Sequence, residues 1–284
     1  RRIAAKDENT SDMAAKAALN AIEQAKISAK EIDLILVPTA TPDMLFPATA
    51  CFVQKKICAT NAACLDISAA CAGFIFGLEI AQQFITSHTY DTVLVIGADK
   101  LTSITNWTDR NTCILFGDGA GAAVVSASEN DRGILSTHLR SDGALCELIA
   151  VPGGGSRLPP SDKVVAERMQ YIKMRGNETF KVAVRTLEEV ARETLAANHL
   201  RVEDLDLYVP HQANVRILKA VAERLGLPPE KVMLNLDRYG NTSAASIPIA
   251  LDEALQQGLI KEGSLVMLGA FGAGLTWASA LIRW

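Results

Sequence analysis

The chain has 284 residues, of which 49% are hydrophobic and 21% charged, and its formal net charge at pH 7 is −4. A chain of this length and hydrophobicity buries a large core, which excludes intrinsic disorder. The acidic balance and an aromatic content of 5% argue against a broad nucleic-acid-binding surface, although a local basic patch stays open.

The start of the chain and its cysteines carry further information. There is no run of 18 apolar residues and no signal-peptide pattern, so we expect no membrane segment and a cytoplasmic location. The six cysteines include no C-x-x-C pair, which argues against a zinc site, and no metal is expected. Because the first residue is Arg1 and the first methionine is Met13, we expect that the natural start lies further upstream.

The first half of the chain predicts helices that alternate with buried strands. Residues 12–26 carry an alanine-rich apolar stripe at helical spacing. Ile32–Pro38 is a largely apolar run that ends at a proline, which is typical of a buried strand. A strand at Ala63–Ile67 leads through small residues into a helical pattern that runs to about Ile85, and Thr92–Gly97 predicts another buried strand.

The second half follows the same order. Residues 181–197 predict an amphipathic helix, and Leu205–Pro210 predicts a buried strand that again ends at a proline. A strand is expected at Val232–Leu236, a helix from about Ile247, and a buried strand at Ser264–Gly269.

An internal repeat relates the two halves. Pro38 and Pro210 lie 172 positions apart, and so do Gly97 and Gly269. Two matched pairs at one offset are hard to obtain by chance. The repeat therefore indicates two similar halves within one fold.

The fold class follows from these elements. Strands that are apolar along their whole length are covered on both faces, which indicates alternating helix and sheet layers. We therefore predict an α/β fold of two pseudo-symmetric halves, residues 1–150 and residues 151–284, with the boundary among the turn formers of Val151–Asp162. A functional site is expected where the halves meet.

Cys71 is the first candidate for chemistry. It lies in D-I-S-A-A-C-A-G-F, after a predicted strand and at the start of a predicted helix. The free N–H groups of a helix start stabilise a thiolate and can hold an oxyanion. Burial as a small apolar residue explains this segment equally well.

Two residues of the second half are candidate partners for Cys71. His211 follows a buried strand in V-P-H-Q-A-N, at the sheet edge where α/β sites form, although a lone histidine is more often an ordinary loop residue. Asn241 lies in Y-G-N-T-S-A-A-S before a predicted helix, where an N-cap is the plain interpretation. At an offset of 172 Cys71 corresponds to Ser243, so the repeat places Asn241 at the equivalent helix start.

Two glycine-rich segments have different predicted roles. Gly117, Gly119 and Ala122 match the dinucleotide-binding pattern G-x-G-x-x-A, but the residues that follow predict a strand instead of a helix. We therefore reject that motif and expect a tight turn between strands. Phe271–Gly274 follows the last repeated strand, where it either brings backbone N–H groups to a ligand or only turns the chain.

Together, the motifs around Cys71, His211 and Asn241 resemble those of the β-ketoacyl-acyl-carrier-protein synthase III family, of the thiolase-like superfamily. F-G-D-G-A-G-A-A and G-A-F-G-A-G-L-T-W support the resemblance, which covers essentially the whole chain. It implies a thiolase-like fold with α-β-α-β-α layers and a triad of these three residues. The implied reaction is the decarboxylative condensation of a short acyl-CoA with malonyl-acyl-carrier protein, which initiates fatty acid biosynthesis without a cofactor.

The resemblance implies binding residues and partners as well. It implies a homodimer in which Phe46 reaches across the interface and closes the primer pocket, which favours a short primer such as acetyl. Coenzyme A is expected to bind at Arg110 and Asn214. The oxyanion that forms when the acyl-Cys71 carbonyl is attacked is expected at the backbone N–H groups of Cys71 and of the turn Gly272, Ala273 and Gly274. The acyl carrier protein is expected at Gln212, Ala213, Asn214, Val215 and Arg216. Members of the family also begin with a further stretch that contains the first strand.

The chain departs from the family at the expected docking helix. Glu223-Arg224 stands where a lysine pair is frequent, so the basic patch formed by Arg216 and Lys219 is weaker. Two rival functions are a secondary-metabolite synthase or acyltransferase on the same fold, and a catalytically silent chain that binds acyl groups. Silent chains usually lose the nucleophile, whereas this one keeps all three triad residues.

Overall fold

Two four-stranded sheets form the framework of the chain, and the computed structural model describes residues 1–128 and 130–284. The first sheet has the order β2-β1-β3-β4, in which only β4 is antiparallel; its strands are β1 (Leu34–Pro38), β2 (Ala63–Ile67), β3 (Thr92–Lys100) and β4 (Asp118–Ser126). The second has the order β5-β10-β9-β8, with β8 and β9 parallel; its strands are β5 (Gly133–Ser141), β8 (Leu207–Pro210), β9 (Leu265–Gly272) and β10 (Thr276–Arg283).

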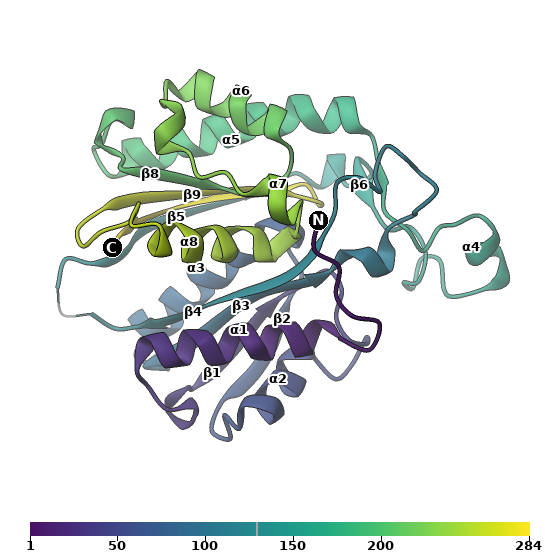
Figure 1. Cartoon of the computed structure of the whole chain (residues 1–284), viewed down its shortest axis with the longest axis horizontal. Helices are drawn as coiled ribbons and strands as arrows, with labels where there is room; N and C mark the ends of the chain where they lie inside the picture. The colour runs from purple at the N-terminus through teal and green to yellow at the C-terminus, as the bar shows by residue number, and fades with distance from the viewer. Residues whose placement is uncertain (129) are drawn as a thin grey trace.

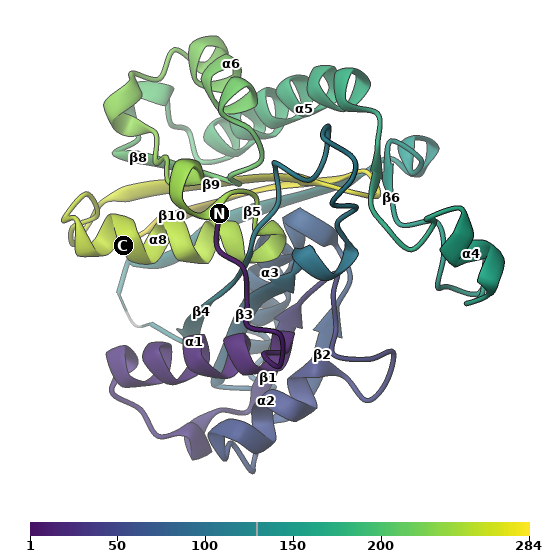
Figure 2. The ribbon, with the colours of Figure 1, turned by 45° about the vertical axis from the view of Figure 1, so that its right-hand side comes forward.

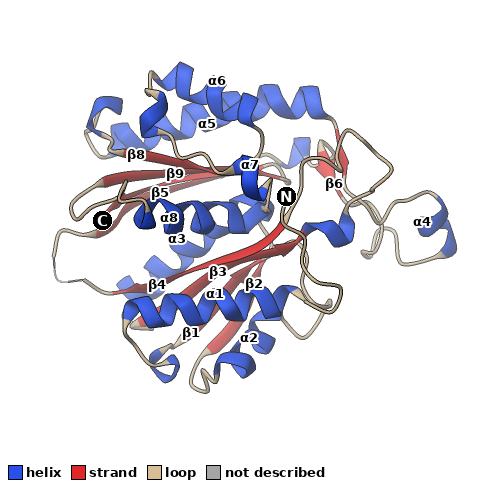
Figure 3. Ribbon diagram, in the orientation of Figure 1, coloured by secondary structure: helices blue, strands red, loops and turns tan. Residues whose placement is uncertain are grey.

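Helices cover the outer face of each sheet and fill the space between the sheets (Figure 1, Figure 3). The first sheet is covered by α1 (Thr10–Ala25) and α2 (Thr49–Ile57). The central layer consists of α3 (Gly73–Thr86) and α8 (Ser246–Gln256), and the second sheet is covered by α5 (Gly176–Ala197) and α6 (Val215–Leu225). The expected α-β-α-β-α layering is confirmed.

Apolar cores hold the layers together. The central core joins α3 and α8 to both sheets, and it includes Phe74, Val95, Ile247 and Leu268. Separate outer cores lie beneath α1 and α2 and beneath α5 and α6. Because the central core takes residues from both halves, the two halves cannot separate without exposing it to water.

The smaller elements form an arm that projects from the layers (Figure 2). The ribbon of β6 (Ile149–Ala150) and β7 (Lys173–Met174) lies at its base, and the arm carries α4 (Asp162–Ala166).

α7 (Leu236–Tyr239) is a single turn that precedes the region of Asn241. Among the residues that the structure describes, no helix is long and apolar enough to cross a membrane.

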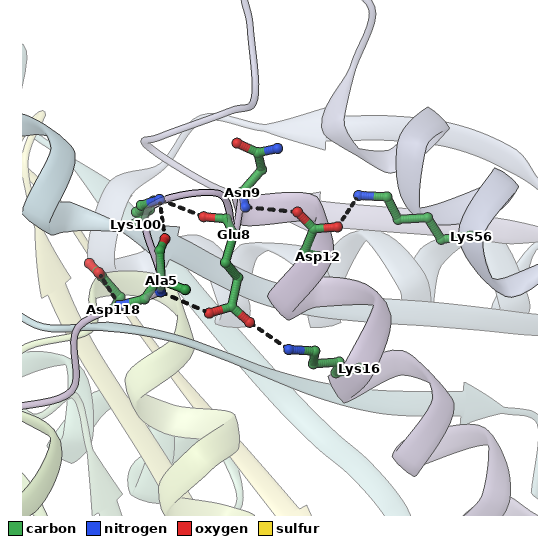
Figure 4. A network of polar contacts seen from close by, with 9 residues as sticks. Ala5, Glu8, Asn9, Asp12, Lys16, Lys56, Lys100 and Asp118 are labelled. Carbon is green, nitrogen blue, oxygen red and sulfur yellow. Dashed lines mark hydrogen bonds and ion pairs between the residues drawn. The ribbon is translucent and has the colours of Figure 1, made fainter.

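Polar contacts fix the segment before α1 to the first sheet (Figure 4). The Lys100 Nζ at the end of β3 donates to the carbonyl oxygens of Ala5 at 3.0 Å and Glu8 at 2.5 Å. Asp12 accepts from the Asn9 N–H at 2.8 Å in the capping box of α1, and its carboxylate pairs with Lys56 of α2 at 2.6 Å. The start of the described chain is thereby anchored next to the end of β3.

Two local predictions were wrong. Val232–Leu236 is not a strand: Val232 makes a single bridge to Tyr208, and Leu236 begins α7. The glycines from 117 to 121 do not form a turn between strands; Gly119 and Gly121 lie within β4. A Cβ on Gly121 would meet α8 backbone at 2.9 Å, so small residues are needed there for close packing, not for a turn.

The expected division of the chain at residue 150 does not coincide with the division between the sheets. Gly133–Ser141 lies within the first predicted half, yet as β5 it pairs with β10 in the second sheet. The chain therefore crosses between the sheets before residue 133.

One edge of β4 differs from its counterpart in the other sheet. β10 pairs on both edges, with β9 and with β5, whereas within the described ranges β4 pairs only with β3. A groove of about 1280 Å³ follows β4 and is lined by residues of α1 and α8. The additional N-terminal strand expected from the resemblance stays a prediction.

The internal repeat is present, but its offset in the structure is 173. Val95 faces the central core, and an offset of 172 would match it with Met267, which faces an outer core. An offset of 173 matches it with Leu268, which faces the central core and occupies the equivalent position in the strand pairing. Side chains alternate between the faces of a sheet, so an error of one residue exchanges the faces.

The starts of the two central helices are also related by an offset of 173 residues. Ala70 and Ser243 each begin a short helical turn before a central helix, and both have positive φ, at 44° and 51°. They are 173 positions apart. Cys71 therefore corresponds to Ala244, and its predicted match with Ser243 was wrong.

Candidate active site

The predicted site residues lie where the two sheets approach the starts of the central helices. The turn Ala70–Ala72 opens α3, and the turn Ser243–Ala245 opens α8. Each turn contacts a strand of the opposite half. Gly272 of β9 lies against Cys71, and Asp99 of β3 accepts a hydrogen bond from the Ala244 N–H.

Cys71 lies in the turn that opens α3, as the sequence predicted, and its burial opposes ionisation of the thiol. Burial raises the pKa of the Cys71 thiol most, the nearby Asp99 carboxylate raises it as well, and the resulting pKa is about 12. The Ser243 hydroxyl and the Cys71 N–H lower the pKa, but by less. Loss of hydration therefore opposes the stabilisation of a thiolate that the helix start is expected to provide.

Gly272 leaves the space beside the Cys71 N–H open. A Cβ at this position would lie 2.7 Å from the Cys71 nitrogen and 3.1 Å from its Cβ. Any side chain would press on backbone that cannot move aside cheaply. Gly272 is buried, Ala273 is half-buried and Gly274 is exposed with φ +140°, so the turn leads from Cys71 towards solvent.

His211 is a buried and neutral side chain. It follows β8, is 3% exposed, and its backbone N–H donates to the Gly269 carbonyl of β9 at 2.7 Å. Burial lowers the pKa of His211 to about 3, so the imidazole is uncharged near neutral pH. A neutral imidazole keeps one N–H donor. Within the described structure its buried Nδ1 has no hydrogen-bond partner.

Hydrogen bonds fix both the backbone and the side chain of Asn241. Its N–H donates to the Leu115 carbonyl and its carbonyl accepts from the Gly117 N–H, both at 2.9 Å. The side-chain Oδ1 accepts from the Ser243 N–H at 2.9 Å. Since a backbone N–H can only donate, this bond fixes the carboxamide and leaves Nδ2 as its donor.

The expected carrier-protein segment divides into an inner and an outer part. The Gln212 side chain is 1% exposed and donates to the carbonyls of Pro210 at 2.9 Å and Met233 at 3.1 Å, so it is committed to the interior. Asn214 caps α6, with its Oδ1 accepting from the Arg216 N–H at 2.8 Å.

The exposed residues of the segment lie at the start of α6. Val215 and Arg216 are exposed, and the Arg216 guanidinium lies 5.6 Å from the centre of the Phe180 ring of α5. At the other end of α6, Arg224 shares the Glu188 carboxylate of α5 with Arg192, at 3.1 Å and 3.2 Å. The exposed charge of Arg216 therefore lies at the opposite end of α6 from this group of charges.

Two predicted binding residues lie on exposed loops. Phe46 is 83% exposed on the loop between β1 and α2. Arg110 is exposed on the loop before β4. The same loop lines a hollow of about 290 Å³ with the projecting arm; the lining residues are Asn106, Trp107, Thr108, Val165, Arg168, Gln170 and Tyr171.

A set of buried residues that the sequence did not predict connects the His211 loop to the Asn241 loop. Gln212 Oε1 accepts from the Asn235 N–H at 3.0 Å. Glu253 of α8 accepts from the Asn235 side chain at 2.9 Å and from the Tyr239 hydroxyl at 2.7 Å. Asp99 was not predicted either, although a carboxylate at the end of an apolar strand, in V-L-V-I-G-A-D, indicates a buried polar residue with a specific role.

Comparison with known proteins identifies close relatives. A family model described as 3-oxoacyl-(acyl-carrier-protein) synthase III matches residues 65–143, and one described as the C-terminal part of the same enzyme matches residues 195–284. Beta-ketoacyl-(acyl-carrier-protein) synthase III of Caldanaerobacter subterraneus subsp. tengcongensis is 52% identical over 284 residues, which is all of this chain and 86% of the relative.

Solved structures agree with the sequence comparison. The crystal structure of 3-oxoacyl-(acyl-carrier-protein) synthase III from Aquifex aeolicus VF5 is similar with a TM-score of 0.92 and 49% identity, covering 100% of this chain and 87% of that one. The priming β-ketosynthase from the R1128 polyketide biosynthetic pathway is similar with a TM-score of 0.91 and 36% identity, covering 100% and 84%.

Proposed function

The chain belongs to the β-ketoacyl-acyl-carrier-protein synthase III family of condensing acyltransferases, and we propose that it joins a short acyl group from coenzyme A to malonyl-acyl-carrier protein. The observation that carries this proposal is the placement of Cys71 against Gly272, with the Asn241 turn of the other half beside it. Acetyl-CoA is the proposed primer donor and the first condensation of fatty acid biosynthesis the proposed role. The reaction as proposed takes place in the cytoplasm and uses no cofactor.

In the first half-reaction the Cys71 sulfur attacks the carbonyl carbon of the acyl thioester. The bond between that carbon and the coenzyme A sulfur breaks, and the Cys71 proton passes to the departing sulfur. Because burial raises the pKa of Cys71, the thiol keeps its proton until this exchange. The Cys71 N–H and the turn from Gly272 to Gly274 hold the oxyanion of the tetrahedral intermediate.

In the second half-reaction the malonyl thioester loses carbon dioxide. The electron pair of the broken carbon–carbon bond forms an enolate, whose oxygen accepts hydrogen bonds from neutral His211 and from the Asn241 Nδ2. The enolate carbon then attacks the acyl carbonyl on Cys71. The Cys71 sulfur leaves as a thiolate and takes a proton from solvent. A depressed pKa suits His211 to this role, because the imidazole donates a hydrogen bond without carrying charge.

We assign coenzyme A to the surface between the site and Arg110, and the carrier protein to the start of α6. Arg110 lies on the loop that lines the hollow beside the projecting arm, and Asn214 caps α6 near His211. Arg216 and Lys219 supply the exposed positive charge for an acidic carrier protein. The buried Gln212 serves the interior instead of the docking surface.

A second copy of this chain is the proposed partner at the edge of the first sheet. β2 is an edge strand, and apolar side chains are exposed on it and on the adjacent loop: Met44, Leu45, Phe46 and Leu65. Such a cluster fits an interface better than water. In a dimer through this edge, Phe46 leaves its own subunit and covers the primer pocket of its partner. Leu65→Lys is expected to yield monomers in analytical ultracentrifugation, and dimers that persist in this variant would contradict the interface.

The proposed function is tested by mass spectrometry of the protein after incubation with acetyl-CoA. Wild type is expected to gain one acetyl group on Cys71, and Cys71→Ala none. The exposed Cys58 and Cys146 provide matched controls, because Cys58→Ala and Cys146→Ala should leave the label in place. Label that persists in Cys71→Ala, or that maps to another cysteine, would show that the nucleophile lies elsewhere.

The similarity to a priming ketosynthase of a polyketide pathway favours a second candidate, a synthase with another primer or acceptor. A panel of acyl-CoA donors, each assayed with and without carrier protein, separates the two. Preference for acetyl-CoA and dependence on malonyl-carrier protein support the first candidate, and a longer or branched primer supports the second.

A further inference from the structure

The two halves of the fold contain equivalent helix starts, but a different residue lies against the backbone N–H of each. At the offset of 173, Cys71 corresponds to Ala244, and Gly272 corresponds to Asp99. At the first helix start the glycine leaves the Cys71 N–H open to the site. At the second the Asp99 Oδ2 accepts from the Ala244 N–H at 3.2 Å. A carboxylate of the protein therefore occupies the position that a substrate oxyanion takes at Cys71.

Asp99 is rigidly held from the side of the first half. It is 0% exposed, and its Oδ1 accepts from the segment that follows β1. The donors are the Ala40 N–H at 2.7 Å, the Thr41 hydroxyl at 2.9 Å, the Thr41 N–H at 3.1 Å and the Thr39 hydroxyl at 3.2 Å. So many converging donors suit a carboxylate and do not suit an amide, whose NH₂ group would face one of them.

The turn that Asp99 holds is the turn that carries Asn241. Ala244 follows Asn241 by three residues, and the Asn241 Oδ1 accepts from the intervening Ser243 N–H at 2.9 Å. Ser243 has a left-handed backbone, which a residue with a Cβ adopts only when its surroundings hold it there. Its hydroxyl lowers the pKa of both the Asp99 carboxyl and the Cys71 thiol, so the Ser243 side chain acts on both groups. Asp99 thus connects one half of the fold to the polar turn of the other.

We propose that Asp99 is a positioning residue for the condensation half-reaction, which fills the second helix start and fixes the turn that aims the Asn241 carboxamide at the substrate. The inference rests on the proposed function. Asp99 does not touch the reacting atoms, so its loss disturbs the decarboxylation step, which uses Asn241, more than the acylation of Cys71, which uses the other helix start.

The test compares Asp99→Asn with wild type in the two half-reactions. Acetylation of Cys71 is followed in a single turnover, and decarboxylation by carbon dioxide release from malonyl-carrier protein. Misplacement of a donor by about 1 Å costs about 10²-fold in rate, so we expect a loss of that order in decarboxylation and only a several-fold loss in acetylation. The matched control is Asp118→Asn. It removes another buried carboxylate, which accepts from the Ala4 and Thr102 N–H groups, and should slow both steps little and equally.

The pH profile of Cys71 alkylation supplies a readout that a purely structural role would not move. The groups that act on this thiol are the Ser243 hydroxyl, the Asp99 carboxylate and the Cys71 N–H, and His211 is neutral. Removing the Asp99 charge alone would lower the pKa of Cys71, whereas a displaced turn withdraws the Ser243 hydroxyl, which lowers this pKa by more than Asp99 raises it. The alkylation profile of Asp99→Asn should therefore shift to higher pH, and that of Asp118→Asn should not shift. If Asp99→Asn does not fold, Thr39→Val is expected to show the same division of rates on a smaller scale, because it removes one hydroxyl donor to Asp99 and leaves the Thr41 N–H bonded to Asp99.

Equal loss of both half-reactions in Asp99→Asn, or losses no greater than in Asp118→Asn, would overturn the inference while an active wild type upholds the proposed function. A wild type that is neither acetylated nor able to release carbon dioxide would overturn both.

Discussion

Gly272→Ala tests the oxyanion site at Cys71 most directly. The added Cβ would lie 2.7 Å from the Cys71 nitrogen and 3.2 Å from the Ala72 nitrogen, and ordinary contact begins at 3.4 Å. Backbone on one side or the other must therefore give way by about 0.7 Å. Overpacking of this kind typically costs about 1–3 kcal/mol of folding free energy, which a domain of this size survives.

The expected loss of activity follows from the donor that this shift displaces. Loss of one oxyanion donor costs about 10²–10³ in rate, so acetylation of Cys71 in Gly272→Ala should slow by about 10²-fold. Decarboxylation of malonyl-carrier protein should be nearly unchanged, because its oxyanion is assigned to His211 and Asn241. Single-turnover mass spectrometry measures the first step, and carbon dioxide release measures the second.

Gly155→Ala is the matched control, because a Cβ at this exposed glycine meets nothing within 4 Å. It should acetylate at the wild-type rate. Acetylation at the wild-type rate in Gly272→Ala would refute the assignment of the oxyanion site, and so would an equal loss of both half-reactions.

Three further predictions concern the other parts of the site. His211→Ala and Asn241→Ala should still accept the acetyl group but release carbon dioxide about 10²–10³ times more slowly; unimpaired release by either would exclude that residue from the enolate site. Arg216→Glu should raise the KM for malonyl-carrier protein, more at low salt, with little effect on acetylation by acetyl-CoA. Arg224, at the other end of α6 and paired with Glu188, serves as the control position. Because burial raises the pKa of Cys71 to about 12, the rate of its alkylation by iodoacetamide should keep rising with pH above 9. The rate is measured in a variant in which the exposed Cys58 and Cys146 are replaced by serine. A rate that reaches a plateau near pH 9 would show that Cys71 has an ordinary thiol pKa.

The sequence by itself predicted the central strands of both sheets and the start of α3, and the resemblance of its motifs to the family identified the candidate triad. The apolar runs at Ile32–Pro38 and Thr92–Gly97 gave β1 and β3, because continuous hydrophobicity identifies a strand buried on both faces. The helix start at Cys71 was also visible, because a strand, small residues and a helical pattern follow one another in the chain. These are local properties, and local pattern suffices for them.

Tertiary structure alone decided the register of the repeat. Matching Pro38 with Pro210 was off by one residue, and the periodicity of an apolar strand covered on both faces contains no signal to correct it, because both faces are hydrophobic. Only the packing of Val95 and Leu268 into the central core, and of Met267 into an outer core, distinguishes an offset of 173 from one of 172.

Tertiary structure also decided the electrostatics of the site. From the sequence, a helix start favours a thiolate at Cys71, yet burial in the folded chain raises the pKa of its thiol and lowers that of His211. Asp99 acquires its role only when β3 meets the Ala244 turn, 145 positions away in the chain. Burial and contacts between distant segments exist only in the folded chain, so composition, spacing and periodicity could not reveal them.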